Sequence, residues 1–93
     1  MDNLEELIDI FSRTTDKKDM RALFGELFTS AELKDIAKRW YLMKEIYRGT
    51  PQRAIAKEME ISLCKITRGS KVLKQDDSRF RAILSDMFDE THL

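Results

Sequence analysis

Apolar residues recur every three or four positions along most of the chain, which is the spacing of side chains on one face of an α-helix. The pattern predicts six short helices: residues 4–13, 17–28 and 30–47, two helices within residues 52–74, and a last helix that begins at residues 76–78. No segment shows the convincing alternation expected of a β-strand. We therefore expect an all-α protein whose 93 residues form a single domain.

Residues typical of helix ends occur at two of the connections between these helices. Thr29 and Glu32 have the spacing of a capping box, which predicts that a helix starts at residue 30. Gly49 is expected to end that helix and Pro51 to start the next, because glycine tolerates a left-handed cap and a first helical turn needs no proline N–H.

The same periodicity predicts which apolar residues outside 52–74 lie on the inner faces of the helices. They are Leu4, Leu7, Ile8, Phe11, Met20, Leu23, Phe24, Leu27, Leu33, Ile36, Ala37, Trp40, Leu42, Met43, Ile46, Tyr47, Phe80, Ile83, Leu84, Met87 and Phe88.

Residues 52–74 carry the pattern of a helix-turn-helix. The positions expected to be buried in it are Ile55, Ala56, Met59, Ile61, Ile66 and Leu73. Ala56 suits a steep crossing of two helices, since a larger side chain would push their backbones apart. Ser62 is a good N-cap for the second helix, and Ile61 would fill the corner between the two.

The outward face of the second motif helix offers small, apolar and cationic side chains: Leu63, Cys64, Lys65, Thr67 and Lys71. Such groups can meet thymine methyls, base edges and phosphates when the helix enters a DNA major groove. No acidic residue occurs between residues 61 and 75, whereas an ordinary solvated face would carry some. Paired amphipathic helices also occur in proteins that do not bind DNA, so a helical interaction module remains an alternative.

Opposite charges are segregated along the chain, although the net charge is zero. Residues 34–74 contain 11 Lys and Arg against 4 Asp and Glu, a local charge of +7. The rest of the chain contains 6 basic and 13 acidic residues, a charge of −7. The positive segment includes the helix-turn-helix, where phosphates would be contacted, and the acidic remainder is expected to weaken nonspecific binding.

The composition, with 42% hydrophobic residues, 3 Gly and 1 Pro, indicates a folded and helix-rich chain. No apolar run approaches a membrane span and the N-terminus lacks the basic flank of a secretion signal, so we expect a cytoplasmic protein. The single Cys64 predicts neither an internal disulfide nor a metal site. His92 is the single histidine, has no partner set for catalysis and is expected to be solvated, so an enzyme is not expected.

The predicted helices carry more apolar surface than a chain of this length can cover by itself. We therefore expect an intertwined homodimer, with helices of the N-terminal and C-terminal parts buried between subunits. Two second motif helices related by a two-fold axis would reach successive major grooves about 34 to 36 Å apart on a near-palindromic operator.

The run Ile66-Thr67-Arg68-Gly69-Ser70, followed by Leu73-Lys74, resembles the tryptophan repressor family of bacteria. Further matching positions are Arg48-Gly49, Gln52-Arg53, Leu27-Phe28-Thr29 and Arg39, and the resemblance extends from about residue 23 to residue 88. It implies an intertwined all-helical dimer that binds double-stranded operator DNA, with L-tryptophan as corepressor and no other cofactor. In the family the ligand lies between the dimer core and the DNA-reading helices and sets the spacing of these helices.

The positions that the resemblance assigns to the ligand site are Leu27, Phe28, Thr29, Arg39, Arg68, Gly69 and Val72. Arg68 would pair with the ligand carboxylate, Arg39 would lie against the indole face, and Gly69 would leave room for the ring. Thr29, with nearby backbone carbonyls of the other subunit, would line the amino end. From the residues alone, the arginines have the alternative roles of phosphate contacts or surface ion pairs. Gly69 could equally be a helix irregularity and Thr29 only a cap.

Val72 departs from the family, which usually has a serine near the ligand amino group. A valine has no hydrogen-bonding group, and a poorly satisfied ammonium costs about 1 to 3 kcal/mol. The consequences to expect are weaker tryptophan binding, binding through backbone carbonyls alone, or a related indole that lacks the amine.

The side chains expected to contact DNA are Gln52, Arg53, Leu63, Cys64, Lys65, Thr67, Lys71 and Lys74. The first two begin the first motif helix, and the last two are expected to bind phosphates. Leu63 and Cys64 offer no bidentate base contact, so readout is expected to be partly apolar, water-mediated or through DNA shape. The predicted function is a tryptophan-activated repressor of tryptophan-related operons. A ligand-independent regulator, one with a different ligand, and an interaction module without DNA binding remain alternatives.

Overall fold

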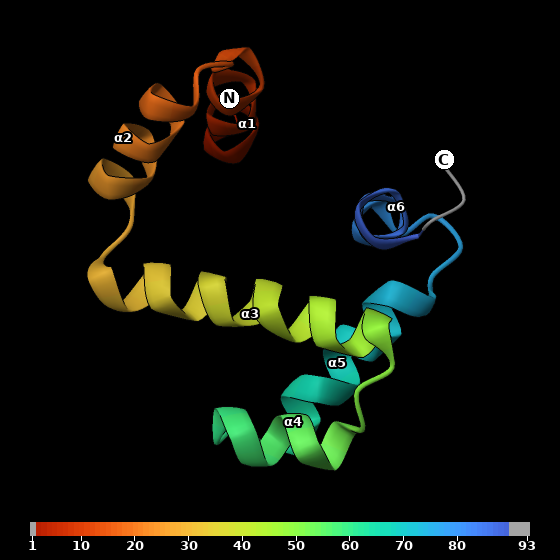
Figure 1. Cartoon of the computed structure of the whole chain (residues 1–93). Coiled ribbons are helices and arrows are strands. Elements are labelled where there is room, and N and C mark those ends of the chain that lie inside the picture. The colour runs from red at the N-terminus through yellow and green to blue at the C-terminus, as the bar shows by residue number, and fades with distance from the viewer. Residues whose placement is uncertain (1, 90–93) are drawn as a thin grey trace. The chain divides into compact units, whose positions relative to one another are not determined.

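The computed structural model describes residues 2–89, which form six helices and no strand (Figure 1). The helices are α1 (Asn3–Arg13), α2 (Lys17–Leu27), α3 (Ser30–Arg48), α4 (Gln52–Met59), α5 (Leu63–Lys74) and α6 (Arg79–Phe88). The all-α prediction is confirmed, and so is the number of helices. The chain divides into two compact units, residues 1–35 and 36–93, and α3 contributes to both. Within the described residues, no helix is both long and apolar enough to cross a membrane.

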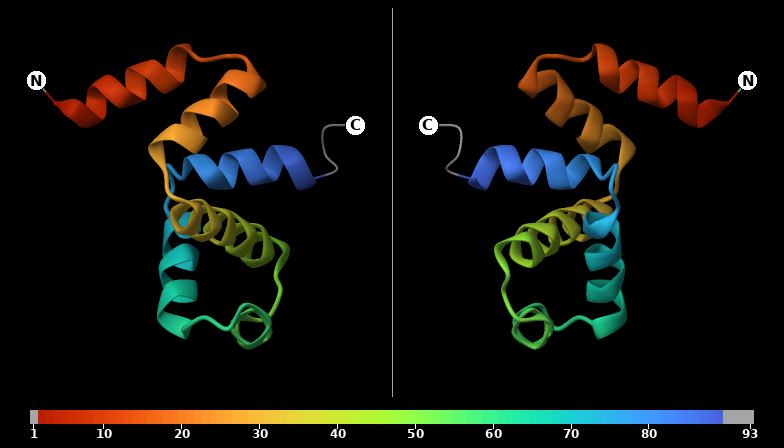
Figure 2. Two further views of the ribbon diagram at one scale, coloured as in Figure 1. Left: turned by 90° about the vertical axis from the view of Figure 1, so that its left-hand side faces the viewer. Right: turned by 90° about the vertical axis from the view of Figure 1, so that its right-hand side faces the viewer.

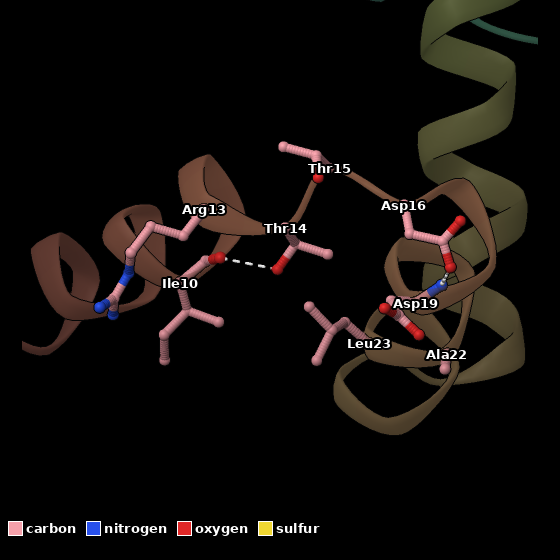
Figure 3. A pocket seen from close by; sticks show the side chains of 8 residues that line it. All are labelled: Ile10, Arg13, Thr14, Thr15, Asp16, Asp19, Ala22 and Leu23. Carbon is pink, nitrogen blue, oxygen red and sulfur yellow. Dashed lines mark hydrogen bonds between the residues drawn. The ribbon is translucent and has the colours of Figure 1, made fainter.

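The first unit is a pair of short helices joined by a polar turn (Figure 3). The hydroxyl of Thr14 donates to the carbonyl of Ile10 over 2.8 Å, and a carboxylate oxygen of Asp16 accepts from the backbone N–H of Asp19 over 3.4 Å. These bonds end α1 and start α2 within three residues. The ring of Phe24 packs against that of Phe11 at 5.6 Å between centroids. Neither α1 nor α2 contains a fully buried residue.

The capping box at the start of α3 forms as the sequence predicts. The backbone N–H of Thr29 donates to the Glu32 carboxylate over 2.9 Å, and the N–H of Glu32 donates to the Thr29 hydroxyl over 3.1 Å. Gly49 follows the other end of α3 with a φ of 87°, a left-handed conformation that glycine adopts without a steric penalty. Pro51 is the N-cap of α4, and the first helical residue is Gln52, at the start of the predicted range 52–74.

The second unit has the hydrophobic core of the molecule, built where the helix-turn-helix meets α3. Leu42, Ile55 and Ile66 are buried together, one from each of α3, α4 and α5. The partly buried side chains packed against them are Ile46, Ala56, Met59 and Ile61. Figure 2 shows α4 end-on where α5 runs in the plane of the picture, so the two helices cross steeply. The predicted helix-turn-helix core is therefore confirmed, including the small Ala56 at the crossing and Ile61 at the corner.

The last helix, α6, is joined to the rest of its unit by aromatic and polar contacts. The ring of Phe80 lies 5.7 Å from that of Trp40 in α3, and Leu84 is fully buried. The guanidinium of Arg81 donates to the carbonyls of Leu73 and Asp76 over 3.2 and 2.9 Å, which satisfies backbone groups at the end of α5. These contacts fix the turn from α5 into α6.

Several apolar positions that the pattern places on inner faces are exposed in a single chain. The exposed members of the predicted set are Leu4, Ile8, Leu27, Ala37, Phe80, Ile83 and Met87, with Leu4 62% exposed and Met87 49% exposed. These positions lie in helices whose apolar faces are only partly covered within one chain, for example by the contacts of Phe11 with Phe24 and of Phe80 with Trp40. Five hydrophobic side chains of the described residues are buried, namely Leu42, Ile55, Ile66, Leu73 and Leu84, and the last of these together with Ile55 and Ile66 is fully buried.

The corner of the helix-turn-helix contains a strained residue. Glu60 follows α4 with φ 54° and ψ 41°, the left-handed conformation that is unfavourable for a side chain with a Cβ. We expect Glu60→Gly to raise the free energy of unfolding by about 0.5 to 1 kcal/mol in urea titrations, because relief of strain exceeds the added chain entropy. Glu60→Ala removes the same charge but keeps the Cβ, and should give no such gain. Equal stability of the two variants would contradict this account.

Candidate nucleic-acid interface

The reading head, by which we mean α4 and α5 together, is held on α3 by close apolar packing. Gly69 of α5 is buried, and a Cβ added there would lie 3.1 Å from Cδ1 of Ile46 and 3.6 Å from Cδ2 of Leu42. The missing side chain lets the backbone of α5 approach α3. Gly69 therefore has a packing role that the sequence did not reveal, beside the ligand role predicted for it.

The outward face of α5 is polar, cationic and free of acids. Its exposed residues are Leu63, Cys64, Lys65, Thr67, Arg68, Lys71 and Lys74, and Gln52 and Arg53 are exposed at the start of α4. The Ser62 hydroxyl accepts from the backbone N–H of Lys65 over 3.4 Å, which confirms Ser62 as the cap. All eight residues predicted to contact DNA are thus solvent-accessible on one helix-turn-helix. Their contacts with DNA remain a prediction.

Thr67 is only partly available for base readout. Its hydroxyl donates to the Leu63 carbonyl one turn earlier over 2.9 Å, so its proton is used within α5. The oxygen keeps lone pairs that can accept a hydrogen bond, for example from a base amino group or a water. Leu63, 50% exposed, presents an apolar surface beside it. The face is suited to accepting hydrogen bonds and to methyl contact, with the cations around it.

The residues predicted for the ligand site are divided between the two units. Arg39, Arg68, Gly69 and Val72 belong to the second unit, whereas the predicted segment at residues 27–29 belongs to the first. Both arginines are exposed and Val72 is half-buried. Within residues 2–89 the structure has one ion pair, between Arg48 and Glu45 at 3.6 Å, so neither Arg39 nor Arg68 is neutralised by a carboxylate there.

The first-unit positions of this set have local roles of their own. Leu27 is 47% exposed, and the ring of Phe28 meets that of Phe24 edge-on at 5.4 Å. The Thr29 hydroxyl accepts the capping bond from Glu32, which confirms its alternative role as a cap. Phe28 and Thr29 therefore have structural roles of their own, whatever they do for a ligand.

Other candidate chemistry is sparse in the described part of the chain. Cys64 is exposed and free, and residues 2–89 contain no group of three or more metal-ligating side chains. His92 lies outside the described residues.

Comparisons with known proteins agree with this architecture. The family model described as "Trp repressor protein" matches residues 2–88. This chain belongs to the Trp repressor family. A Trp operon repressor homolog of Chlamydia trachomatis serovar L2 is 32% identical over 90 residues, which cover 90% of this chain and 96% of that protein. One from Xylella fastidiosa strain M23 is 30% identical over 78% of this chain and 80% of that protein, and one from Vibrio vulnificus is 25% identical over 94% and 86%.

No solved structure matches the chain significantly. The family is one of transcription regulators, so this Trp repressor family member is a repressor-like regulator and not an enzyme. The resemblance inferred from the run at residues 66–70 is therefore confirmed at the level of the family.

A polar bond between α3 and α4 in this Trp repressor family member was not predicted from the sequence. The phenol of Tyr41 donates to the carboxylate of Glu58 over 2.7 Å, and a Glu45 oxygen lies 3.5 Å from the same phenol. The hydrogen bond to Glu58, followed by burial and the charge of Glu45, raises the pKa of Tyr41 to about 12. The phenol is therefore protonated, and able to donate, throughout the neutral range.

The raised pKa makes a pH-dependent contribution to stability. Because the folded pKa lies above the ordinary 10.0, the stabilisation is fully present below pH 10.0 and is lost as the pH rises through about 12. In Tyr47→Phe, which leaves Tyr41 as the single tyrosine, phenolate absorbance should develop with a midpoint near 12 while circular dichroism still shows native helix. Adding Glu58→Ala, which removes the acceptor, should move the midpoint down towards 10.0. A midpoint that is the same with and without Glu58→Ala would show that the bond is absent in solution.

Proposed function

We propose that this Trp repressor family member is a cytoplasmic, homodimeric repressor that binds operator DNA when L-tryptophan is bound, and that it acts on tryptophan-related operons. The observation that carries the proposal is the outward face of α5, which is exposed and cationic and has no acid from residue 61 to residue 75. This face is presented by a helix-turn-helix whose inner side is packed on α3. A groove-binding helix needs both properties.

The proposed DNA contacts divide into positioning and readout. Lys71, Lys74 and Arg53 are exposed cations suited to phosphates, and phosphate contacts fix the register of the protein on the duplex. Lys65 is placed in the first turn of α5, where side chains reach base edges when a helix enters the groove by its N-terminal end. Leu63 and Cys64 contribute apolar contact and shape. The expected binding is therefore strongly salt-dependent.

The proposed corepressor site uses two exposed arginines, Arg39 and Arg68, which form no ion pair within residues 2–89. Arg68 would bind the tryptophan carboxylate through paired hydrogen bonds, and Arg39 would lie over the indole ring. Gly69 would leave space for the ring, and Leu27, Phe28 and Thr29 of a second copy would line the amino end. Val72 supplies no polar group for the ammonium, so we expect weaker binding than a serine at this position would give, by about 1 to 3 kcal/mol.

The homodimer is supported by apolar surface that one chain leaves uncovered. Phe80, Ile83 and Met87 form an exposed stripe on α6, each between 45% and 49% exposed. In the first unit, an open and largely apolar groove of about 630 Å³ is lined by Met20, Phe24, Leu33 and neighbouring residues. A second copy that buried the stripe and the groove would supply the core that α1 and α2 lack.

Sedimentation at micromolar concentration should therefore give twice the 11.0 kDa mass of the chain. Ile83→Glu, which puts a charge in the exposed stripe, should shift the equilibrium towards monomer. Lys18→Glu changes charge at an exposed position outside the stripe and should leave the dimer intact. A wild-type monomer at these concentrations would refute the dimer.

The function is tested by titrating the DNA upstream of the protein's own gene with and without L-tryptophan, and following the labelled DNA by fluorescence anisotropy. Tight binding only with tryptophan supports the corepressed regulator. DNA binding of the same affinity with and without tryptophan would instead indicate a ligand-independent regulator or one with a different ligand. Absence of binding in both conditions at low salt would overturn the DNA-binding proposal in favour of an interaction module.

Arg53→Ala should weaken operator binding about 5-fold to 150-fold at moderate salt, because it removes a cation at the start of α4. Lys18→Ala also removes an exposed cation, but from the first unit, and should change affinity little. Equal affinity of Arg53→Ala and wild type would remove Arg53 from the interface.

Arg68→Ala should abolish the calorimetric signal of L-tryptophan binding while leaving the helical content unchanged, because Arg68 is exposed and packs into no core. Lys71→Ala, which removes a neighbouring cation of α5, should bind tryptophan normally. Intact binding by Arg68→Ala would show that the pocket lies elsewhere.

A further inference from the structure

One polar bond fastens the reading head to α3 across a long stretch of sequence. The phenol of Tyr41 in α3 donates to the carboxylate of Glu58 in α4 over 2.7 Å. Glu45 lies one turn along α3 and is farther from the phenol, at 3.5 Å. A phenol has one proton to donate, so the shorter contact takes it. Lys44 lies 5.7 Å above the Tyr41 ring and balances part of the negative charge gathered there.

The hydrogen bond between Tyr41 and Glu58 is directional, whereas the apolar contact beside it is not. Leu42, the next residue of α3, is buried with Ile55 of α4 and Ile66 of α5. Hydrophobic burial holds these helices together but is not directional, whereas a hydrogen bond weakens steeply when its geometry changes. With the bond formed beside this cluster, rotation of α4 about the apolar contact would stretch it.

We propose that Tyr41 and Glu58 are positioning residues that hold the reading head at a preset tilt on α3 before any ligand binds. The consequence for DNA rests on the function proposed above. A ligand shifts the equilibrium between two orientations of the head only by its differential affinity for them. If the head already holds the DNA-binding orientation without ligand, a corepressor can increase the DNA affinity by a smaller factor. This regulator should therefore retain more operator affinity without ligand than it would without the bond.

The decisive variant is Tyr41→Phe, which removes one hydroxyl and changes neither the ring nor the charge of the head. The matched control is Tyr47→Phe, since the Tyr47 phenol donates to Asp89 over 2.8 Å and joins α3 to the end of α6. The quantity to measure is the dissociation constant for the upstream DNA, without tryptophan and with saturating tryptophan. Glu58→Ala is a second variant, which removes the acceptor but also makes the head more positive and so raises DNA affinity in both conditions.

We expect Tyr41→Phe to weaken ligand-free DNA binding about threefold to tenfold and to change liganded binding much less, so that the enhancement by tryptophan increases. Tyr47→Phe should leave that enhancement at its wild-type value. Glu58→Ala, which removes the acceptor, should raise the enhancement as Tyr41→Phe does, with no further increase in the double variant. An unchanged enhancement in Tyr41→Phe, or tighter ligand-free binding, would overturn the proposal.

Amide hydrogen exchange separates failure of this inference from failure of the proposed function. Loss of the bond should speed exchange in α4 and α5 of Tyr41→Phe, whereas Tyr47→Phe should not affect these helices. If wild type binds no DNA under any condition, the repressor proposal fails and exchange alone decides whether the head is held by Tyr41. Identical exchange in wild type and Tyr41→Phe would overturn the positioning role.

Discussion

The close contact between α5 and α3 is the constraint on which the reading head depends. Gly69 allows the backbone of α5 to approach Ile46 and Leu42, and Ile66 of the same helix is fully buried beside them. Burial of each such aliphatic side chain contributes about 1.5 to 3 kcal/mol relative to exposure. Since α4 and α5 share this one small core with α3, the orientation of the exposed cationic face of α5 is set by a few apolar contacts and by the bond between Tyr41 and Glu58.

Local signals in the sequence predicted the helices and their ends well. Ser62, Thr29 and Gly49 act within a few residues of their own positions, so spacing alone revealed them. The bond between Tyr41 and Glu58 joins residues 17 positions apart, and no periodicity predicts such a pair. The left-handed Glu60 was also missed, because glutamate gives no signal for that conformation.

The sequence predicted some of the functional positions but not the surfaces that would cover the apolar faces. The helix-turn-helix and its exposed cationic face followed from residue type and period, since burial of one face leaves the other to solvent. The apolar faces of α1 and α6 were expected to be buried between subunits, and in one chain several of their residues are exposed. Pattern identifies the face of a helix that avoids water, but it does not identify the surface that will cover this face. Membership of the Trp repressor family was carried by a short run of residues at 66–70.

The single tryptophan of the chain has a consequence for spectroscopy. Trp40 packs on Phe80, so its emission reports chiefly the environment between α3 and α6. Loosening of α4 and α5 from α3 would leave that ring pair in place. Tryptophan fluorescence would then follow the unfolding of α3 and α6 but not the detachment of α4 and α5. Circular dichroism, which records all the helices, would give a different unfolding midpoint, and the two midpoints would describe two separate transitions.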